Sequence, residues 1–470
     1  MAEGRSNSSW LFWLGMALAV LGVFGCGGNG ATTGTTATTG TTTSSGTNGT
    51  ITPGISTLNI EFPTDVADSG AAVGNNSGMQ YYGGSGIFRS PSGTITNLKG
   101  LDGATTNAHV QAVNDSGLAV GNCVLNSQAL ATVWVNAVVS KLATPAGFST
   151  NLATSVNDGG QIVGYGQTLS KGTAEVETLS ESGAPTGGTF TLSLVVGGQT
   201  ETTGAIPYNA SAVQVEGFIN GLAAVQGLGG VSCVGGPFPT TNVTITFKTA
   251  GPENVFTANS AGLAGGTNPK AKVVETTHGV GSMLVTEGLY WPTPTSQPQV
   301  LLPAGLIPIQ IANNGEVVGW VAGSDNAHTY YKQNVTTASA PTVVGNTNLN
   351  AYIAVNATGS IVLAGGVSGS EAVLLSPSGQ TTNIASGASS LSINAEGDVA
   401  GLETIANDAQ VAFIWTKAKG VVNLMSYLPK NSGWTTLYPA SMNDNGLLVG
   451  EGFKGGTLVS FLLQLPTGAF

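Results

Sequence analysis

Few residues in this chain have the type and spacing that catalysis requires. The three histidines are His109, His278 and His328, and no two of them have the spacing of a metal-binding pair. The sequence holds neither a Gly-x-Ser-x-Gly turn, which would present a serine nucleophile, nor a Gly-x4-Gly-Lys-Ser/Thr loop, which would hold phosphate. His109 and His328 are expected in loops. No catalytic, cofactor-binding or metal-binding residue is therefore nominated, and no cofactor is expected.

Two short motifs look functional but lack their structural context. GEGFKG (residues 450–455) has the spacing of a dinucleotide-binding loop. The segment after it, TLVSFLL, reads as a strand rather than the helix that this loop requires. LPTG (465–468) lacks the spacer residue and the hydrophobic tail of a sortase signal. A pair of carboxylates that cleaves a glycosidic bond remains open, because distant segments of a repeat protein can supply it.

The cysteines are Cys26, Cys123 and Cys233, and none forms a Cys-x-x-Cys pair that would indicate zinc. Cys123 and Cys233 fall in different predicted domains. A disulfide between them remains possible, while two small buried side chains are the simpler interpretation.

The first 26 residues are typical of an export signal. Residues 10–24 form an uncharged apolar run, which suits a signal-peptide core of about 7 to 15 residues better than a membrane-spanning helix of about 20. The run ends in Val-Phe-Gly-Cys (23–26), which resembles the lipobox of bacterial lipoproteins. The resemblance implies lipid on Cys26 and, because Gly27 rather than Asp follows, the outer membrane of a Gram-negative cell. Ordinary secretion and an uncleaved anchor are the alternatives.

Residues 27–54 are almost entirely Gly, Thr, Ser and Asn, so they carry too little apolar surface to fold. We interpret them as a flexible tether between the membrane and the folded part. The whole chain has a formal charge of −11 and few Lys or Arg residues. It therefore lacks the basic surface that nucleic-acid binding requires. Frequent Gly and β-branched residues favour short strands joined by tight turns.

One motif recurs seven times, and MNDNGLLVG (residues 442–450) is an example. A strand should end at the hydrophobic residue, Asn and Asp should start a turn, and the first Gly should take a positive φ. The first Gly of each copy stands at 70, 117, 160, 315, 359, 397 and 446. The copies at 313 and 357 lack the Asn-Asp pair, which argues against calcium. We therefore interpret Asp68, Asp115, Asp158 and Asp444 as turn formers.

Each repeat of about 44 residues holds about four predicted strands, a number and period that favour a blade of a β-propeller. The repeat resembles the HAF repeats of secreted bacterial proteins, whose units read hydrophobic-Asn-x-x-Gly-x-Val-Val-Gly and then Ala-Phe-x-Trp. AFIWTKAKGVVNL (412–424) is the closest match. The resemblance covers about 300 residues and implies no activity.

One interval between copies is 155 residues, about 110 longer than the rest, which indicates an insertion at residues 171–283. Within it we predict a hairpin that turns at Gly197-Gly198, a helix capped by Asn209 or Ser211, and a half-buried strand NVTITFKT. The insertion is similar to a module of large bacterial surface proteins and some phage structural proteins. That resemblance implies display or adhesion and carries no catalytic residue.

The sequence thus predicts a mainly β protein, a seven-bladed β-propeller with a small α+β domain inserted in the third blade. The expected parts are a signal peptide and lipobox (1–26), a tether (27–54), blades 1 to 3 in part (55–170), the insertion (171–283), and the rest of blade 3 with blades 4 to 7 (284–470). The expected function is a cell-surface lipoprotein that binds a protein or a polysaccharide. The alternatives are a carbohydrate-active enzyme with carboxylates at the propeller mouth and a purely structural envelope protein.

The ring should close by pairing the two ends of the chain, since the seventh repeat lacks one strand. We predict that the apolar segment at residues 56–61 supplies this outer strand beside residues 458–463. An open ring would leave an unpaired hydrophobic edge.

Overall fold

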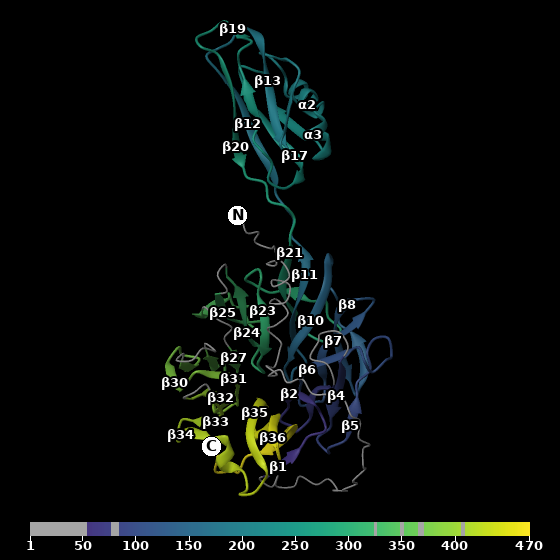
Figure 1. Ribbon diagram of the computed structural model, residues 1–470, viewed down its shortest axis with the longest axis vertical. Helices are drawn as coiled ribbons and strands as arrows, with labels where there is room; N and C mark the ends of the chain where they lie inside the picture. Colours follow the sequence, from purple (N-terminus) through teal and green to yellow (C-terminus); the bar gives the residue numbers. More distant parts are fainter. Residues whose placement is uncertain (1–53, 77–83, 324–326, 348–351, 365–370, 406–408) are drawn as a thin grey trace, which may run out of the picture. The chain divides into compact units, whose positions relative to one another are not determined.

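The computed structural model describes residues 54–76, 84–323, 327–347, 352–364, 371–405 and 409–470. The protein is mainly β and holds many antiparallel sheets (Figure 1). It divides into two compact units: unit 1 runs up to Gln167 and resumes at Thr286, and unit 2 is Thr168–Val285. The export signal, Cys26 and nearly all of the tether lie outside the described residues. None of the helices in the described ranges has the length and apolar character needed to cross a membrane.

The described part of unit 1 contains seven four-stranded antiparallel sheets, one for each copy of the motif. In chain order of their repeats they are β2 (Phe62–Val66), β3 (Ala72–Asn76), β4 (Ser85–Arg89) and β5 (Ile95–Asn97); β6 (Ala108–Val113), β7 (Ala119–Leu125), β8 (Gln128–Val135) and β9 (Val138–Lys141); β10 (Phe148–Val156), β11 (Ile162–Leu169), β21 (Leu284–Trp291) and β22 (Gln299–Val300); β23 (Ile307–Ile311), β24 (Glu316–Ala322), β25 (His328–Asn334) and β26 (Thr342–Thr347); β27 (Tyr352–Val355), β28 (Ile361–Ala364), β29 (Glu371–Leu375) and β30 (Thr381–Ser386); β31 (Ala388–Ile393), β32 (Val399–Thr404), β33 (Gln410–Thr416) and β34 (Gly420–Asn423); and β35 (Trp434–Met442), β36 (Leu447–Lys454), β37 (Thr457–Gln464) and β1 (Gly54–Thr57). A 3-10 helix, η3 (Leu424–Tyr427), follows β34.

The second strand of each sheet is the apolar run of the motif, and its first residues are buried on both faces, as a continuous apolar run predicts. The Gly that closes this run allows a close approach to the first strand. A Cβ at Gly121 would overlap the carbonyl oxygen of His109, and the pairing of β6 with β7 shifts register beside it, between Val110 and Ala112. A Gly is needed there because the bulged first strand passes so close to the second.

The hydrophobic core of unit 1 is divided among the spaces between consecutive sheets. One buried cluster joins β3 of the first sheet, through Val73, to Val110 and Trp134 of the second. Equivalent clusters lie between each following pair of sheets. A further cluster packs Leu447 and Val449 of the seventh sheet against residues of the first sheet. The first and last repeats are therefore packed together as neighbouring repeats are.

The N-terminal strand completes the seventh sheet, as the sequence predicted. β1 pairs antiparallel with β37, and Ile55 stands opposite Leu463. The strand covers Gly54–Thr57 rather than residues 56–61, and Leu58 still donates its N–H to the carbonyl oxygen of Ser460 in β37 at 3.0 Å. Leu58 and Ile60 of the segment that follows are buried in the cluster between the seventh and first sheets.

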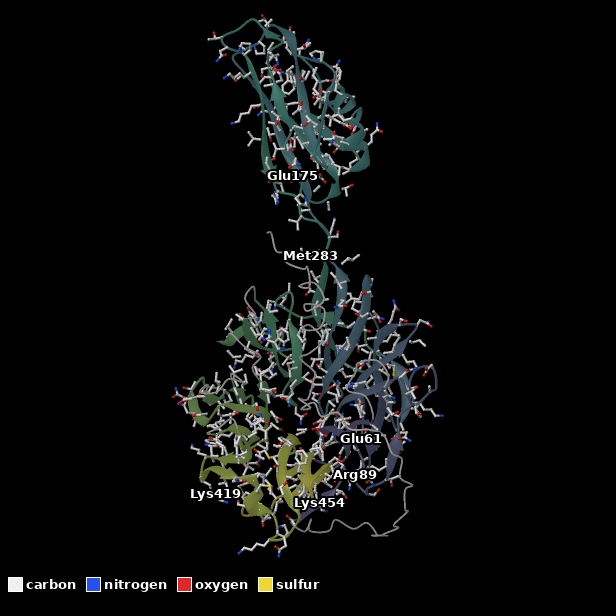
Figure 2. All side chains as sticks on the ribbon, viewed as in Figure 1. Glu61, Arg89, Glu175, Met283, Lys419 and Lys454 are labelled. Atoms are coloured by element: carbon white, nitrogen blue, oxygen red, sulfur yellow. The ribbon has the colours of Figure 1, made fainter. Side chains whose placement is uncertain are left out.

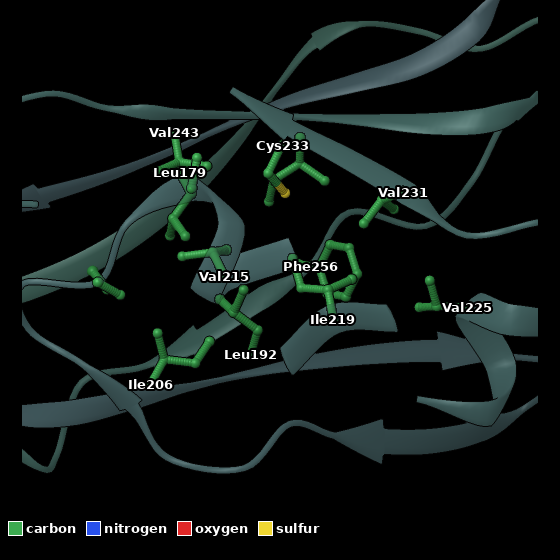
Figure 3. Close-up of a cluster of buried hydrophobic side chains, with 14 of the residues drawn as sticks. Leu179, Leu192, Ile206, Val215, Ile219, Val225, Val231, Cys233, Val243 and Phe256 are labelled. Atoms are coloured by element: carbon green, nitrogen blue, oxygen red, sulfur yellow. The ribbon is translucent and has the colours of Figure 1, made fainter. Parts of the chain in front are cut away.

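Unit 2 folds around its own core, in which α2 (Ala212–Asn220) and α3 (Ala223–Gly227) pack against strands (Figure 3). Ser211 caps α2 in a capping box with Gln214, as one of the two predicted caps. The predicted hairpin pairs Val196 with Gln199 around the two glycines. The sheets comprise β12 (Ala174–Ser182), β16 (Val231–Gly235), β17 (Val243–Ala250) and β20 (Lys270–Thr277), and separately β13 (Gly187–Val196), β14 (Gln199–Thr202), β15 (Ile206–Pro207), β18 (Thr257–Asn259) and β19 (Leu263–Ala264).

Candidate functional site

The seven turns of the motif lie between the first two strands of each sheet, and hydrogen bonds join them one to the next. We call this set the turn circuit; it comprises residues 66–70, 113–117, 156–160, 311–315, 355–359, 393–397 and 442–446. Within a turn, the Asn side chain closes the loop: Asn114 Oδ1 accepts the N–H of Leu118 at 3.0 Å. Gly117 completes the loop with a φ of +77°, which the sequence predicted.

The Asp that follows the Asn reaches to another turn. Asp115 Oδ1 accepts the N–H of Ser69 in the preceding turn at 2.8 Å, and its own N–H donates to Asp158 Oδ1 in the next turn at 2.9 Å. Asp158 donates in the same way to Asn313 Oδ1, at 2.9 Å. The aspartates lie in the turns, as predicted, but the prediction that their side chains bond the backbone of their own turn is wrong. Their carboxylates join neighbouring repeats, and the amide oxygen of Asn313 serves equally well.

The Asn side chains add a second set of bonds in the same direction. Asn114 Nδ2 donates to the carbonyl oxygen of Asn157 at 2.9 Å, and Asn356 Nδ2 donates to that of Asn394 at 2.8 Å. Asn443 Nδ2 in the last turn donates to the carbonyl oxygen of Ala67 in the first, at 2.8 Å.

The fourth and fifth turns are joined differently, because Ala357 has no side-chain oxygen with which to accept a hydrogen bond from the fourth turn. There the side chain of Gln310, at the end of β23, accepts the N–H of Val355 at 2.9 Å. Residues at the same place make this link elsewhere, as when Asp65 Oδ2 accepts the N–H of Val113 at 3.0 Å. The other consecutive turns are bonded to one another directly, and the fourth and fifth are connected through Gln310 at the end of β23.

The turn circuit gathers negative charge. Asp115, Asp158 and Asp444 are exposed, and Asp68 is half-buried. Burial, and then the charges of the other three aspartates, raise the pKa of Asp68 to about 6. Burial raises the pKa of Asp444 as well. None of these four carboxylates forms an ion pair with a residue in the described ranges. A cationic group placed at this face would lower the repulsion among them.

The histidines do not lie at the turn circuit. His109 and His328 were expected in loops, and the structure places both in strands. His109 lies in β6, where burial lowers its pKa to about 4. His328 lies in β25 and is stacked on Trp320 with ring centroids 4.1 Å apart. Both fall on strands because the alternating pattern around them, rather than their polarity, decides the local structure.

Glu451 and Glu61 are a pair of carboxylates in unit 1 whose charges interact. Glu451 lies in β36 and Glu61 immediately precedes β2 (Figure 2 labels Glu61). Burial, with a smaller contribution from the charge of Glu61, raises the pKa of Glu451 to about 7. Sequence reasoning left such a pair open and had no signal with which to nominate these two residues, because 390 positions separate them.

In unit 2 the structure brings together Glu175, Glu275 and His278, which sequence reasoning did not connect. Glu275 and His278 are close in the chain, as Glu-x-x-His, but Glu175 lies on another strand. The one signal in the sequence was that short spacing, which is too common to nominate a site.

No protein-family model matches the chain, and no curated protein matches it. Several solved structures match loosely. Acylaminoacyl peptidase from Pyrococcus horikoshii matches with 8% identity and a TM-score of 0.42 over 84% of this chain and 49% of that one. Puromycin hydrolase matches with 10% identity and a TM-score of 0.41, over 85% of this chain and 51% of that one. The chain thus spans about half the length of these two proteins. TolB from Acinetobacter baumannii matches with 12% identity and a TM-score of 0.26, over 42% and 60% of the two chains.

Proposed function

We propose that unit 1 is a closed seven-bladed β-propeller and that unit 2 is a domain inserted in its third blade. Seven four-stranded sheets, a buried cluster between each consecutive pair, and the continuous hydrogen bonding of the turn circuit support this arrangement. The insertion is supported by the third sheet, whose strands β11 and β21 flank unit 2 in the chain.

The protein is, in this proposal, a lipoprotein held at the cell surface by lipid on Cys26, with residues 27–54 as its tether. Support comes from the apolar run and the lipobox-like ending of the leader. The test is fractionation of cells that express wild type or Cys26→Ala. The variant should leave the membrane fraction, and a variant that fractionates with the membrane as wild type does would contradict lipidation.

Its function is to bind a protein ligand that presents a cationic segment, without catalysis. The observation that carries this proposal is the set of four carboxylates in the turn circuit, where burial and then the charges of the other three raise the pKa of Asp68 to about 6. A cationic segment would neutralise this repulsion, while a neutral polysaccharide would not. A tether and a rigid, closed propeller suit a protein that presents a binding face away from the membrane.

The experiment compares a fluorescent oligolysine peptide with an oligoglutamate peptide and a panel of neutral oligosaccharides. The double variant Asp115→Asn/Asp158→Asn removes two charges and keeps two amide oxygens as acceptors. Glu371→Gln removes one exposed carboxylate elsewhere and is the control. We expect oligolysine to bind, with an affinity that falls at high salt and at least tenfold in the double variant. Equal binding to wild type and the double variant would contradict the proposal.

A second function is favoured by one specific observation, the pair Glu61 and Glu451. A carboxyl group that keeps its proton near neutral pH, beside a second carboxylate, is the pattern of a glycoside hydrolase. In that case the pKa of about 7 makes Glu451 the acid. A screen of aryl glycosides tests this function: turnover that Glu451→Gln abolishes would support it, and turnover unchanged in that variant would exclude this pair.

A further inference from the structure

Three side chains with metal-binding atoms converge at the end of unit 2 through which the chain enters and leaves (Figure 2 labels Glu175 there). His278 Nδ1 lies 2.7 Å from Glu275 Oε1 and 3.9 Å from Glu175 Oε2. The three ligand atoms all lie within 4.8 Å of one another. Ligand atoms around a tetrahedral Zn²⁺ ion are about 3.4 Å apart, given bonds of about 2.1 Å. The observed separations therefore fit around one ion after small side-chain rotations.

Glu175 is the unusual member of this cluster, because its side chain is fully buried. Its Oε2 atom accepts the N–H groups of Gly279 at 2.8 Å and Glu253 at 3.3 Å. Its Oε1 atom is buried and has no hydrogen-bond partner among the described residues. A buried carboxylate oxygen without a partner is costly unless a cation or a hydrogen-bond donor satisfies it. Oε2, the oxygen that lies 3.9 Å from His278 Nδ1, is thus held by two backbone N–H groups, and the other oxygen, Oε1, has no hydrogen-bond partner.

Further acidic groups surround Glu175. Glu177, two residues along β12, is also fully buried, and the pairing of β12 with β20 places it opposite Glu275. Like charges opposite one another weaken a sheet. A cation bound between these carboxylates would replace their mutual repulsion with attraction to the ion.

The backbone around the cluster is closely packed, so the segments that carry Glu175 and His278 are held in place before an ion binds. A Cβ at Gly279 would overlap the carbonyl oxygen of Gly251, so only Gly fits beside His278. Thr173 and Val280 exchange two hydrogen bonds, each of 2.8 Å, next to the cluster. Such preorganisation raises metal affinity because little order is lost on binding.

We propose that Glu175, Glu275 and His278 bind one divalent transition-metal cation of the Zn²⁺ class. The imidazole nitrogen favours Zn²⁺ over Ca²⁺ and Mg²⁺, which take oxygen ligands. Three protein ligands leave a position for water, and the exposure of His278 and Glu275 gives the ion access. The ion would fasten the first strand of unit 2, β12, to its last strand, β20.

The test is titration of the metal-free full-length protein with Zn²⁺, and separately with Ca²⁺, by calorimetry, together with melting curves. We expect one Zn²⁺ per chain, and a higher melting temperature of unit 2 with Zn²⁺ because the ion binds only the folded state. His278→Ala and Glu275→Gln change exposed side chains and should weaken Zn²⁺ binding at least tenfold. Glu175→Gln should do the same, and Glu371→Gln, a glutamate exposed in unit 1, should bind as wild type does.

Two results would overturn the proposal: wild type that binds no Zn²⁺, or His278→Ala and Glu275→Gln variants that bind it as wild type does. Tighter binding of Ca²⁺ than of Zn²⁺ would overturn the assigned class of ion. Because the two exposed variants need not disturb the core, the test remains decisive even where Glu175→Gln fails to fold.

Discussion

Asp444 donates its backbone N–H to Asp68 Oδ1 at 2.6 Å, although 376 residues separate the two in the chain. Within a repeat protein this bond is the same one that joins Asp115 to Asp158 in neighbouring repeats. The last turn is therefore bonded to the first turn in the way that neighbouring turns are bonded to each other. The bond shows why the motif is repeated: most copies supply an acceptor for the copy before them, and the seventh copy finds its acceptor in the first.

The seam between the ends of the chain should be essential for stability. A chain that begins at Gly54 keeps β1, whereas one that begins at Phe62 loses β1, Leu58 and Ile60. Each of these two buried side chains contributes about 1.5–3 kcal/mol. We expect the shorter chain to melt on the order of 10 °C lower, or to aggregate through the open edge of β37. Equal melting temperatures for the two chains in differential scanning calorimetry would contradict the role of the seam.

The link between turns should depend on an acceptor and not on its charge. Asp115→Asn keeps an oxygen in place to accept the N–H of Ser69, as Asn313 Oδ1 naturally does for the N–H of Asp158. Asp115→Ala removes that acceptor and should cost about 1 kcal/mol of unfolding free energy. Urea denaturation measures both variants. Equal loss in Asn and Ala variants would show that the charge, rather than the hydrogen bond, is what matters.

Features of the fold that depend on local sequence were predictable. The four strands per repeat, the positive φ of Gly117 and the cap at Ser211 each follow from residues that are close together in the sequence. The pairing of β1 was predictable as well, because an incomplete seventh repeat leaves an edge that only an apolar segment near the N-terminus can cover. The predicted strand begins two residues and ends four residues too far along the chain, because strand ends depend on where the chain must bend toward the core.

The candidate sites were not predictable, because they depend on contacts between distant segments. Whether the carboxylate of Asp115 bonds its own turn or the preceding one is decided by the packing of sheets, which no pattern within a repeat records. The burial of Glu175 depends on β17, β20 and the Gly279 loop, all more than 60 residues further along the chain. An exposed Glu and a fully buried one look alike in the sequence.

The Gly that closes each apolar run should tolerate no side chain. Gly121→Ala would place a methyl group against the carbonyl oxygen of His109, at a bulge where the two strands cannot separate without breaking their pairing. Overpacking of this kind typically costs about 1–3 kcal/mol. Gly217→Ala in α2 is the matched control, since a Cβ there has nothing within 4 Å and Ala favours a helix. Thermal melting should show a loss for the first variant and none for the second.

The stability of unit 1 should depend on pH through Glu451. Burial and the charge of Glu61 raise its pKa from 4.5 to about 7. The folded protein therefore binds this proton more tightly than the unfolded chain does. The stabilisation that this bound proton gives the folded state is complete below pH 4.5 and is lost as the pH rises through 7. Glu451→Gln is neutral at every pH, so its melting temperature should rise relative to wild type by a few degrees between pH 4.5 and 8.

The comparison that decides this prediction is the difference between variant and wild type, since other carboxyl groups give both proteins a common pH dependence. Asp68, with a pKa raised to about 6, titrates in the same range and cancels from that difference. Glu371→Gln controls for the loss of one exposed charge. A difference between Glu451→Gln and wild type that stays constant from pH 4.5 to 8 would mean that Glu451 is ionised throughout. It would then be unsuited to act as the acid of a glycoside hydrolase, and the binding function alone would remain.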